Sequence, residues 1–218
     1  MKRDSGIDRR QFLLGAAAVS TLAAGCAPLT QRVAGRRRAE DISLPTRGGS
    51  EAHRFLHRAA FGPIPGEPRR FAEMGRDEYL KAQLHPTDED DPAMKFLLSR
   101  LDVMRVGSAE LRDLPEGQVM RQLRQAAILR AVYSQWQLRE RVVDFWTNHF
   151  NIFAHKGDGA YRKNIDDLAV VRAHALGRFP DMVRASARSS AMLGYLDNQV
   201  NRKGVANENY ARELLELH

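Results

Sequence analysis

The chain has 218 residues, a formal net charge of +7 and 43% hydrophobic residues. A chain of this length and composition is long enough to bury one sizeable core. Its single cysteine excludes an intrachain disulfide framework. The positive charge is most simply a solvated basic face, with anionic membrane surfaces or acidic glycans as alternative partners.

The first element predicted along the chain is a targeting segment over residues 1–25. Arg9 and Arg10 precede an apolar stretch, residues 12–25, that is rich in alanine and glycine. This stretch is shorter than the roughly 20 residues that cross a bilayer, so it is typical of a signal peptide and resembles a twin-arginine export signal. Its Ala-Ala-Gly-Cys ending resembles a lipobox and predicts lipidation of Cys26. A buried N-terminal helix and an ordinary cleaved secretory signal are the weaker alternatives.

The mature chain is expected to begin with a flexible tether, residues 26–49, which has Pro, Gly and an arginine run but no apolar period. A lipid on Cys26 would attach this tether to a membrane. The expected localisation is therefore export by the twin-arginine route, followed by anchoring as a periplasmic or outer-membrane lipoprotein. Such a destination argues against a nucleic-acid partner despite the basic charge.

Residues 50–218 are predicted to form a mainly α, irregular multi-helix domain. Apolar residues recur at intervals of three and four, and no segment reads convincingly as a strand. Ser50 is the expected N-cap of the first helix, and Gly62 and Pro63 end it. The other predicted helices cover residues 68–74, 77–84, 92–104, 116–133, 136–150, 165–175, 180–187 and 191–196, followed by a last helix capped by Asn207.

The predicted helix over residues 136–150 has two distinct faces. Ser134 and Gln137 have the spacing of a capping box, which places the helix start near Trp136. The expected apolar stripe is Leu138, Val142, Phe145 and His149, and the expected polar stripe is Arg141, Asp144, Asn148 and Asn151. A histidine on an apolar stripe is more often a buried core residue than a functional one. The asparagines beside His149, however, favour a functional pocket.

Four stretches of the sequence resemble a known family. LRERVVDFWTNHF at residues 138–150 and NENYARELLELH at residues 207–218 look like signature stretches of the bacterial family called domain of unknown function 1800. Residues 57–63 and 191–198 resemble its opening and middle. The resemblance implies an exported protein whose chain continues further, so that the domain is an N-terminal portion, truncated at the C-terminus. It implies no activity, substrate or catalytic residue.

The last predicted helix supplies most of a candidate site. Arg212 stands between two glutamates along one face, which suits a salt-bridged surface helix as well as a site for proton transfer or metal binding. His149 is expected to lie near the start of this helix and to complete the site. The candidate residues are Asn148, His149, Asn207, Glu208, Asn209, Arg212, Glu213, Glu216 and His218.

A second candidate is a metal site around the polar loop before the last helix. Six side chains with amide or carboxylate oxygens fall within 13 residues, and such oxygens are the ligands of hard cations such as Ca²⁺. The candidate metal residues are Asp197, Asn198 and Glu208, with a divalent ion as the candidate cofactor. Asparagine and aspartate are also ordinary turn and cap residues, and the spacing matches no EF-hand.

Two functions remain open from the sequence. The first is a binding or scaffolding lipoprotein of the cell envelope that works with an envelope protein or a glycan, for which Tyr195 and Tyr210 beside asparagines are suitable contacts. The second is a metal-assisted envelope hydrolase acting on an external polymer or lipid. We favour binding, because no established catalytic constellation, such as a Gly-x-Ser-x-Gly elbow, emerges from the residues. Whether the protein is an enzyme stays open.

Overall fold

A computed structural model describes residues 49–87 and 92–217 of the chain. The chain divides into two units, and the larger one, residues 45–63 and 67–218, contains every helix considered below. Within the described residues, no helix is both long enough and apolar enough to span a lipid bilayer. Four residues named in the sequence predictions lie outside the described part: Arg9, Arg10, Cys26 and His218.

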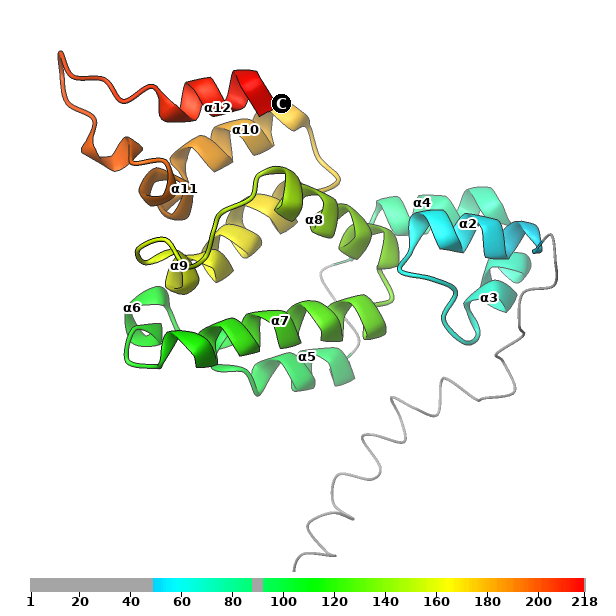
Figure 1. Cartoon of the computed structure of the whole chain (residues 1–218). Helices are drawn as coiled ribbons and strands as arrows, with labels where there is room; N and C mark the ends of the chain where they lie inside the picture. The colour runs from blue at the N-terminus through cyan, green and yellow to red at the C-terminus, as the bar shows by residue number, and fades with distance from the viewer. Residues whose placement is uncertain (1–48, 88–91, 218) are drawn as a thin grey trace, which may run out of the picture. The chain divides into compact units, whose positions relative to one another are not determined.

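The described part of the chain is mainly α, as the sequence predicted (Figure 1). It contains eleven α-helices and three short helical segments but no strand, and Arg202 and Val205 form an isolated bridge. In chain order the elements are α2 Glu51–Ala59, α3 Glu67–Met74, α4 Arg76–Leu84, α5 Pro92–Ser99, η2 Asp102–Met104, α6 Ser108–Leu111, α7 Glu116–Tyr133, α8 Gln137–His149, α9 Gly159–Asp166, η3 Asp167–Arg172, α10 Phe179–Arg188, α11 Ser190–Tyr195, η4 Asn198–Val200 and α12 Asn209–Leu217.

Several helix boundaries follow local signals in the sequence. α7 has the bounds predicted for residues 116–133. Ser50 caps α2 as predicted, because its hydroxyl oxygen accepts the backbone N–H of His53 at 3.3 Å. Gly75 separates α3 from α4 at a φ of 78°, a left-handed conformation that favours glycine.

Other boundaries differ from the prediction because of packing. α5 ends at Ser99 and not near residue 104, since Leu101 has extended backbone angles and the separate turn η2 follows. α9 begins at Gly159, earlier than predicted. A Cβ at Gly159 would lie 2.8 Å from the carbonyl oxygen of Ala154, so a close approach between helix and loop requires this glycine.

Helices α2, α3 and α4 form one small cluster around aromatic rings. The rings of Phe55, Phe71 and Tyr79 pack with centroid separations of 5.0 to 5.9 Å, and Leu56 is buried beside them. Burial raises the pKa of the Tyr79 hydroxyl, and its hydrogen bond to Glu67 at 2.7 Å adds to the rise. This cluster contacts the N-terminal part of α8.

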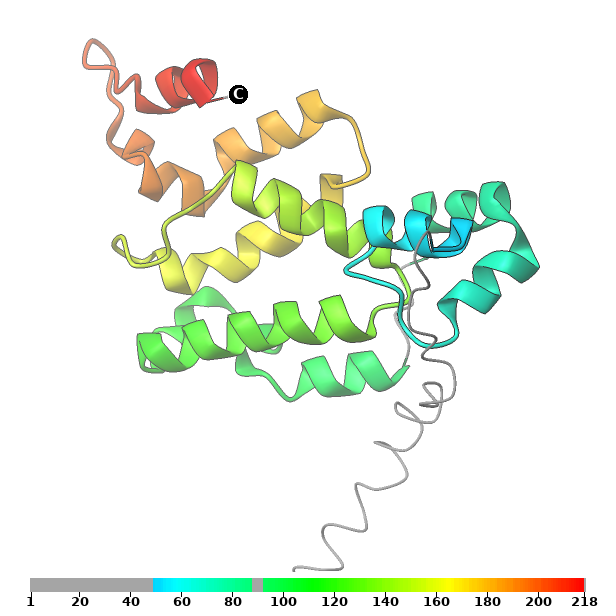
Figure 2. The same ribbon diagram turned by 45° about the vertical axis from the view of Figure 1, so that its right-hand side comes forward.

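Helix α7 is the centre of the next group. It packs against α5, η2, α8 and α9, and Figure 2 shows α5 and α7 side by side. The apolar core of this group extends from α5 through α6 to α7. Its buried residues are Met94, Leu98, Leu101, Val103, Leu111, Val119 and Ala126.

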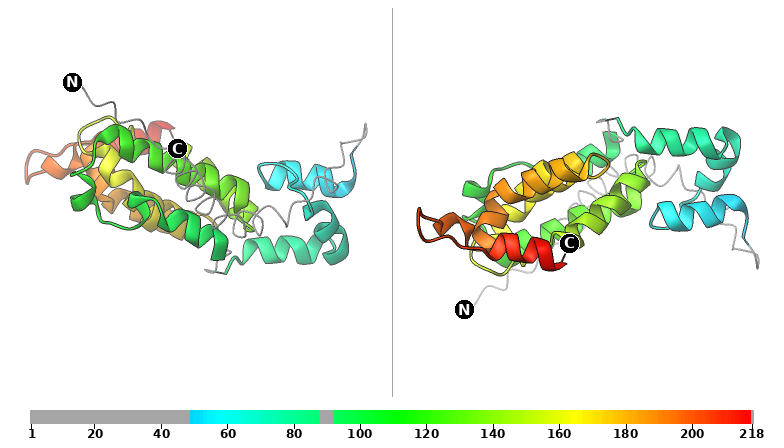
Figure 3. Two further views of the ribbon diagram at one scale, coloured as in Figure 1. Left: turned by 90° about the horizontal axis from the view of Figure 1, so that it is seen from below. Right: turned by 90° about the horizontal axis from the view of Figure 1, so that it is seen from above.

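The C-terminal helices form a looser group. Met182 of α10 and Met192 of α11 are buried in a core that also includes Phe150. α12 has no buried residue and packs on this core through Tyr210 and Leu214, beside α10 (Figure 3). The Tyr210 hydroxyl donates to the carbonyl oxygen of Val183 at 3.3 Å.

Helix α8 presents a different face to the interior than its apolar pattern predicted. Phe145, expected on the apolar stripe, is 56% exposed, whereas Glu140 and Val143 are buried. The prediction of the apolar stripe was wrong at Phe145 because it chose the interior face from apolar residues alone and did not consider Glu140. Glu140 is tolerated inside because a cation from another helix pairs with it.

The start of α8 also differs from the predicted capping box. The Ser134 hydroxyl accepts the backbone N–H of Trp136 at 3.1 Å, and Gln137 Nε2 donates to the Ser134 carbonyl oxygen at 2.8 Å. The amide of buried Gln83 reaches across from α4: its Nε2 donates to the Gln135 carbonyl at 2.9 Å. Its Oε1 accepts the backbone N–H of Leu138 at 3.1 Å, so a side chain from α4 takes part in capping the start of α8.

Candidate functional site

Helices α7 and α8 and segment η3 bring four charged side chains together inside the described part of the chain. Arg172 forms a bidentate pair with Glu140, with N–O distances of 2.9 and 2.7 Å, and its Nε donates to Asp167 at 2.9 Å. Arg130 reaches the same Asp167 oxygen at 3.3 Å. We call Arg130, Glu140, Asp167 and Arg172 the ion-pair wall.

The ion-pair wall is well paired. Arg130 and Glu140 are buried, and Asp167 and Arg172 are half-buried. Burial disfavours the charged guanidinium of Arg172, but the hydrogen bonds and charges of Glu140 and Asp167 outweigh this effect and raise its pKa above the ordinary value. The wall is therefore a rigid set of opposite charges that cancel one another, and its groups have little capacity left for chemistry.

Segment η3 is a π-helix, and its wider turn is what lets Asp167 meet Arg172 five residues later. Such turns are rare and are often found at functional sites. Here the segment supplies two of the four members of the ion-pair wall. It also places Val170 and Val171, which are both buried, into two different hydrophobic clusters.

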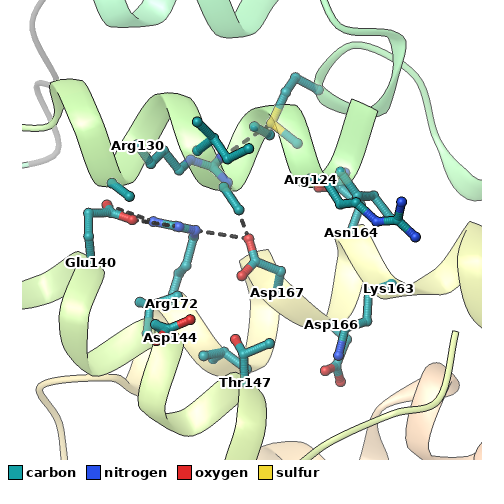
Figure 4. A pocket seen from close by; sticks show the side chains of 18 of the residues that line it. Arg124, Arg130, Glu140, Asp144, Thr147, Lys163, Asn164, Asp166, Asp167 and Arg172 are labelled. Carbon is teal, nitrogen blue, oxygen red and sulfur yellow. Dashed lines mark hydrogen bonds and ion pairs between the residues drawn. The ribbon is translucent and has the colours of Figure 1, made fainter. Parts of the chain in front are cut away.

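A cavity of about 430 Å³ lies beside the ion-pair wall (Figure 4). We call it the α7 cavity, because α7 contributes the largest share of its lining. This volume is within the range of about 300–1,000 Å³ that is common for small-molecule sites. Its walls away from the ion pairs are mostly apolar and include Met104, Met120, Leu123, Ala126, Ala127, Val143 and Val171.

Three polar residues of α9 line the cavity together, namely Lys163, Asn164 and Asp166. Burial lowers the pKa of the Lys163 amine, and the charges of Asp166 and Asp167 oppose this shift. Burial likewise raises the pKa of the Asp166 carboxyl, although Ser189 Oγ donates to it at 2.5 Å. Perturbed groups of this kind in a cavity are typical of binding and catalytic sites.

The predicted composite site corresponds in part to a second pocket. Its volume is about 320 Å³, and its lining includes Asn148 and His149 at the end of α8, Asn151 just after it, and Glu213 from α12. Helix α12 thus brings one of its predicted site residues to the same pocket as His149. We call this the α12 pocket, and its other lining residues are Phe150, Met192, Tyr195, Leu196, Tyr210, Leu214 and Leu217.

The other predicted site residues on and before α12 do not line the α12 pocket. Arg212 forms exposed ion pairs with Glu208 at 3.9 Å and with Glu213 at 3.8 Å. Asn209 Oδ1 accepts from Arg212 at 3.0 Å, and the Asn207 side chain accepts the backbone N–H of Asn209 at 2.9 Å. Glu216 is exposed. These contacts are those of a surface helix with its cap.

The candidate metal residues also have protein partners. Asp197 accepts from Lys156 Nζ at 3.0 Å, and Asn198 Oδ1 accepts from Asn201. Glu208 forms the exposed pair with Arg212. In the described ranges, no group of three His, Cys, Asp or Glu side chains is arranged so that it could hold a metal ion.

The surroundings of His149 are aromatic. Its ring stacks on the exposed Phe145 ring with centroids 5.5 Å apart and an interplanar angle of 14°. Trp146 and Phe150 meet it edge-on at 5.5 and 5.4 Å. His149 therefore belongs both to the aromatic cluster at the end of α8 and to the lining of the α12 pocket.

Sequence reasoning missed the ion-pair wall, although a signal for it exists. Trp136, Glu140, Val143 and Thr147 follow one another at intervals of four, three and four, which places them on one helix face. Trp136 and Val143 are buried, so the glutamate between them had to be buried as well. A charged residue in register with apolar ones predicts a buried ion pair.

The comparisons with known proteins concern most of the chain. Residues 54–218 match the model of a family described as "Protein of unknown function (DUF1800)". No curated protein matches the chain, and no solved structure does.

Proposed function

The chain belongs to the DUF1800 family, and for this member we propose a binding protein of the cell envelope that holds a glycan in the α12 pocket. The observation that supports the proposal is the composition of this pocket. Two tyrosines, Tyr195 and Tyr210, line it together with Asn148, Asn151 and Glu213. It combines aromatic rings with amide and carboxylate groups on side chains that are half-buried or exposed.

This combination suits a sugar because a sugar ring has two kinds of surface. Its C–H groups pack on aromatic rings, which offer apolar area with little conformational freedom to lose. Its hydroxyl groups both donate and accept, as asparagine side chains do, and they donate to a carboxylate. Asn148 donates to the carbonyl oxygen of Asp144 at 2.9 Å, which holds its side chain in place at the pocket.

Binding is favoured over hydrolysis by the number of carboxylates. Glycoside hydrolysis commonly uses a pair of carboxyl groups on either side of the scissile bond. Among the described residues that line the α12 pocket, Glu213 is the one carboxylate. A metal-assisted envelope hydrolase is the alternative, and it is kept as an outcome of the experiment.

The proposal includes export by the twin-arginine route and a lipid anchor on Cys26. The paired arginines, Arg9 and Arg10, and the lipobox-like ending support it. Fractionation of cells that produce the full chain is the test. We expect the protein in the membrane fraction, and Cys26→Ala should move it to a soluble fraction. Unchanged membrane attachment of the variant would contradict the lipid anchor.

Glycan binding is tested with chitotriose, a neutral oligosaccharide that carries both hydroxyl and acetamido groups, by titration calorimetry of the full chain. Glu213→Gln should weaken binding about threefold to tenfold, the effect of losing a hydrogen bond to a charged acceptor. Glu216→Gln is the matched control, because Glu216 lies on the same helix but does not line the pocket. Equal affinity of both variants, or no saturable binding, would contradict the glycan site.

Two further measurements on the same sample address the hydrolase. Mass spectrometry of the incubated chitotriose would detect shorter products, and elemental analysis of protein purified from its native export route would detect a bound metal. We expect intact chitotriose and no stoichiometric metal. Cleavage together with a stoichiometric metal would replace the binding proposal with the hydrolase.

A further inference from the structure

The α12 pocket has an aromatic neighbour on the surface of α8. His149 lines the pocket, and the ring of Phe145 stacks on His149 but does not line the pocket itself. We propose that Phe145 is a second subsite, on which a further sugar of an oligosaccharide stacks while its end sugar occupies the pocket. This second subsite rests on the proposed glycan pocket and adds to it a preference for a longer ligand.

The ring of Phe145 is accessible to a ligand. Phe145 is 56% exposed, although it belongs to a helix that packs against several others. Its ring lies nearly parallel to the ring of His149, with centroids 5.5 Å apart and an interplanar angle of 14°. Because more than half of the residue stays exposed beside this stack, aromatic surface remains open for the C–H groups of a sugar.

The ring of Phe145 is also held in place. Trp146 packs against it edge-on, with centroids 4.9 Å apart and an interplanar angle of 70°. Trp146 in turn is fixed to the next helical region, because its Nε1 donates to the carbonyl oxygen of Ala175 at 3.2 Å. A ring that is positioned before the ligand arrives loses little conformational freedom on binding, which favours affinity.

Exposed polar side chains stand next to Phe145 on α8. Asn148, three residues later, lines the α12 pocket and donates its Nδ2 to the carbonyl oxygen of Asp144, so its exposed side-chain oxygen can accept from a sugar hydroxyl. The Asp144 carboxylate forms an exposed pair with Arg141 at 3.8 Å, and these two charges offset each other. An apolar ring with such neighbours suits a neutral sugar better than a broad apolar face of a protein partner.

The spacing of the two rings sets the length of the ligand. Phe145 and His149 are four residues apart on α8, so they lie on the same helix face about one turn, or 5.4 Å, apart. His149 stands between the pocket and Phe145. A monosaccharide held in the pocket therefore leaves Phe145 uncovered, whereas a chain of three sugars can pass His149 and reach it.

The test compares N-acetylglucosamine with chitotriose, its trimer, by titration calorimetry of the full chain. Phe145→Ala should weaken the binding of chitotriose about twofold to tenfold, the effect of losing one aromatic contact, and should leave the affinity for the monosaccharide unchanged. Phe153→Ala is the matched control. Phe153 is 55% exposed and its ring lies 5.5 Å from that of His155, but it does not line the α12 pocket. It should change neither affinity.

Two further variants separate stacking from general apolar contact. Phe145→Tyr keeps a flat ring and should bind chitotriose as the native protein does. Phe145→Leu keeps an apolar side chain without a ring and should bind chitotriose as weakly as Phe145→Ala. Circular dichroism of each variant checks that it is folded, which the exposure of Phe145 leads us to expect.

The outcomes distinguish the second subsite from the pocket. Glu213→Gln should weaken both sugars, because both occupy the α12 pocket. If it does so while Phe145→Ala binds chitotriose with native affinity, or weakens both sugars equally, the pocket stands and the second subsite is overturned. No saturable binding of either sugar would contradict the glycan pocket and the second subsite together.

Discussion

The ion-pair wall and the α12 pocket use charged residues in opposite ways. In the wall, each carboxylate is paired with arginine, and Glu140 is 4% exposed. In the α12 pocket, Glu213 and the asparagines are half-buried or exposed, and α12, which carries Glu213, has no buried residue. The wall lies among tightly packed helices, whereas α12 attaches through two side chains.

The difference separates a structural role from a binding role. A buried charge is costly unless its partners compensate fully, so the wall constrains how α7, α8 and η3 pack. A half-exposed carboxylate keeps part of its hydration and has capacity left for a ligand. Glu213 also has an arginine partner, Arg212 at 3.8 Å, but this pair is half-exposed. Charged residues alone therefore do not mark the site, and their burial decides the role.

The largest loss of stability is expected when one charge is removed from the ion-pair wall. Glu140→Gln would leave the half-buried Arg172 without its bidentate partner, and we expect the free energy of unfolding to fall by about 3 kcal/mol. Urea denaturation followed by circular dichroism measures it. Glu213→Gln is the matched control, and its effect should stay below about 0.5 kcal/mol.

A double variant sharpens this contrast. Glu140→Leu combined with Arg172→Met removes both partners, so no buried charge of this pair is left uncompensated. The double variant should lose less stability than the sum of the single variants, by about 0.5–3 kcal/mol. Strict additivity would mean that the two side chains are not coupled and that the wall has no structural role.

The next effect concerns pH and the carboxyl of Asp166. Burial raises the pKa of this group above its ordinary value of about 3.9. The folded state therefore holds the proton more tightly than the unfolded state, and its contribution to stability is lost as pH rises through the raised pKa. Asp166→Asn cannot ionise, so it should be more stable relative to the native protein at neutral pH than in acid.

The measurement for Asp166 is a series of urea denaturation curves between acidic and neutral pH. Asn keeps an acceptor for the hydroxyl of Ser189, which donates to Asp166 at 2.5 Å. Asp181→Asn serves as the control, since Asp181 forms an exposed pair with Arg184. A stability difference between Asp166→Asn and the native protein that is independent of pH would show that the carboxyl is not perturbed.

The smallest effect is expected on α12. Leu215 is 84% exposed, so Leu215→Ser should change the free energy of unfolding by no more than about 0.5 kcal/mol. Thermal unfolding of both proteins is the measurement. A large loss of stability would mean that Leu215 is covered in the folded protein. α12 would then be packed as tightly as the helices around the ion-pair wall.

Sequence patterns predicted the parts of the fold that depend on local signals. Ser50 and Pro115 start their helices through capping and backbone geometry, which neighbouring residues determine. The buried face of α8 was missed because Glu140 is compensated by a partner 32 residues away. Apolar periodicity cannot show such a partner, and the α12 pocket likewise depends on contacts between distant helices.

The π-helical segment η3 has a consequence for how the length of the chain can change. A π turn holds more residues than an α turn, so deleting one residue within 167–172 would convert it to regular α-helix. The residue removed would be the extra one that the π turn holds, so the positions before and after the segment would keep their faces. Within the segment, the side chains of Val170, Val171 and Arg172 would have to change direction. Insertions and deletions should therefore be absent from this segment in functional relatives and frequent in the exposed loop at residues 201–206.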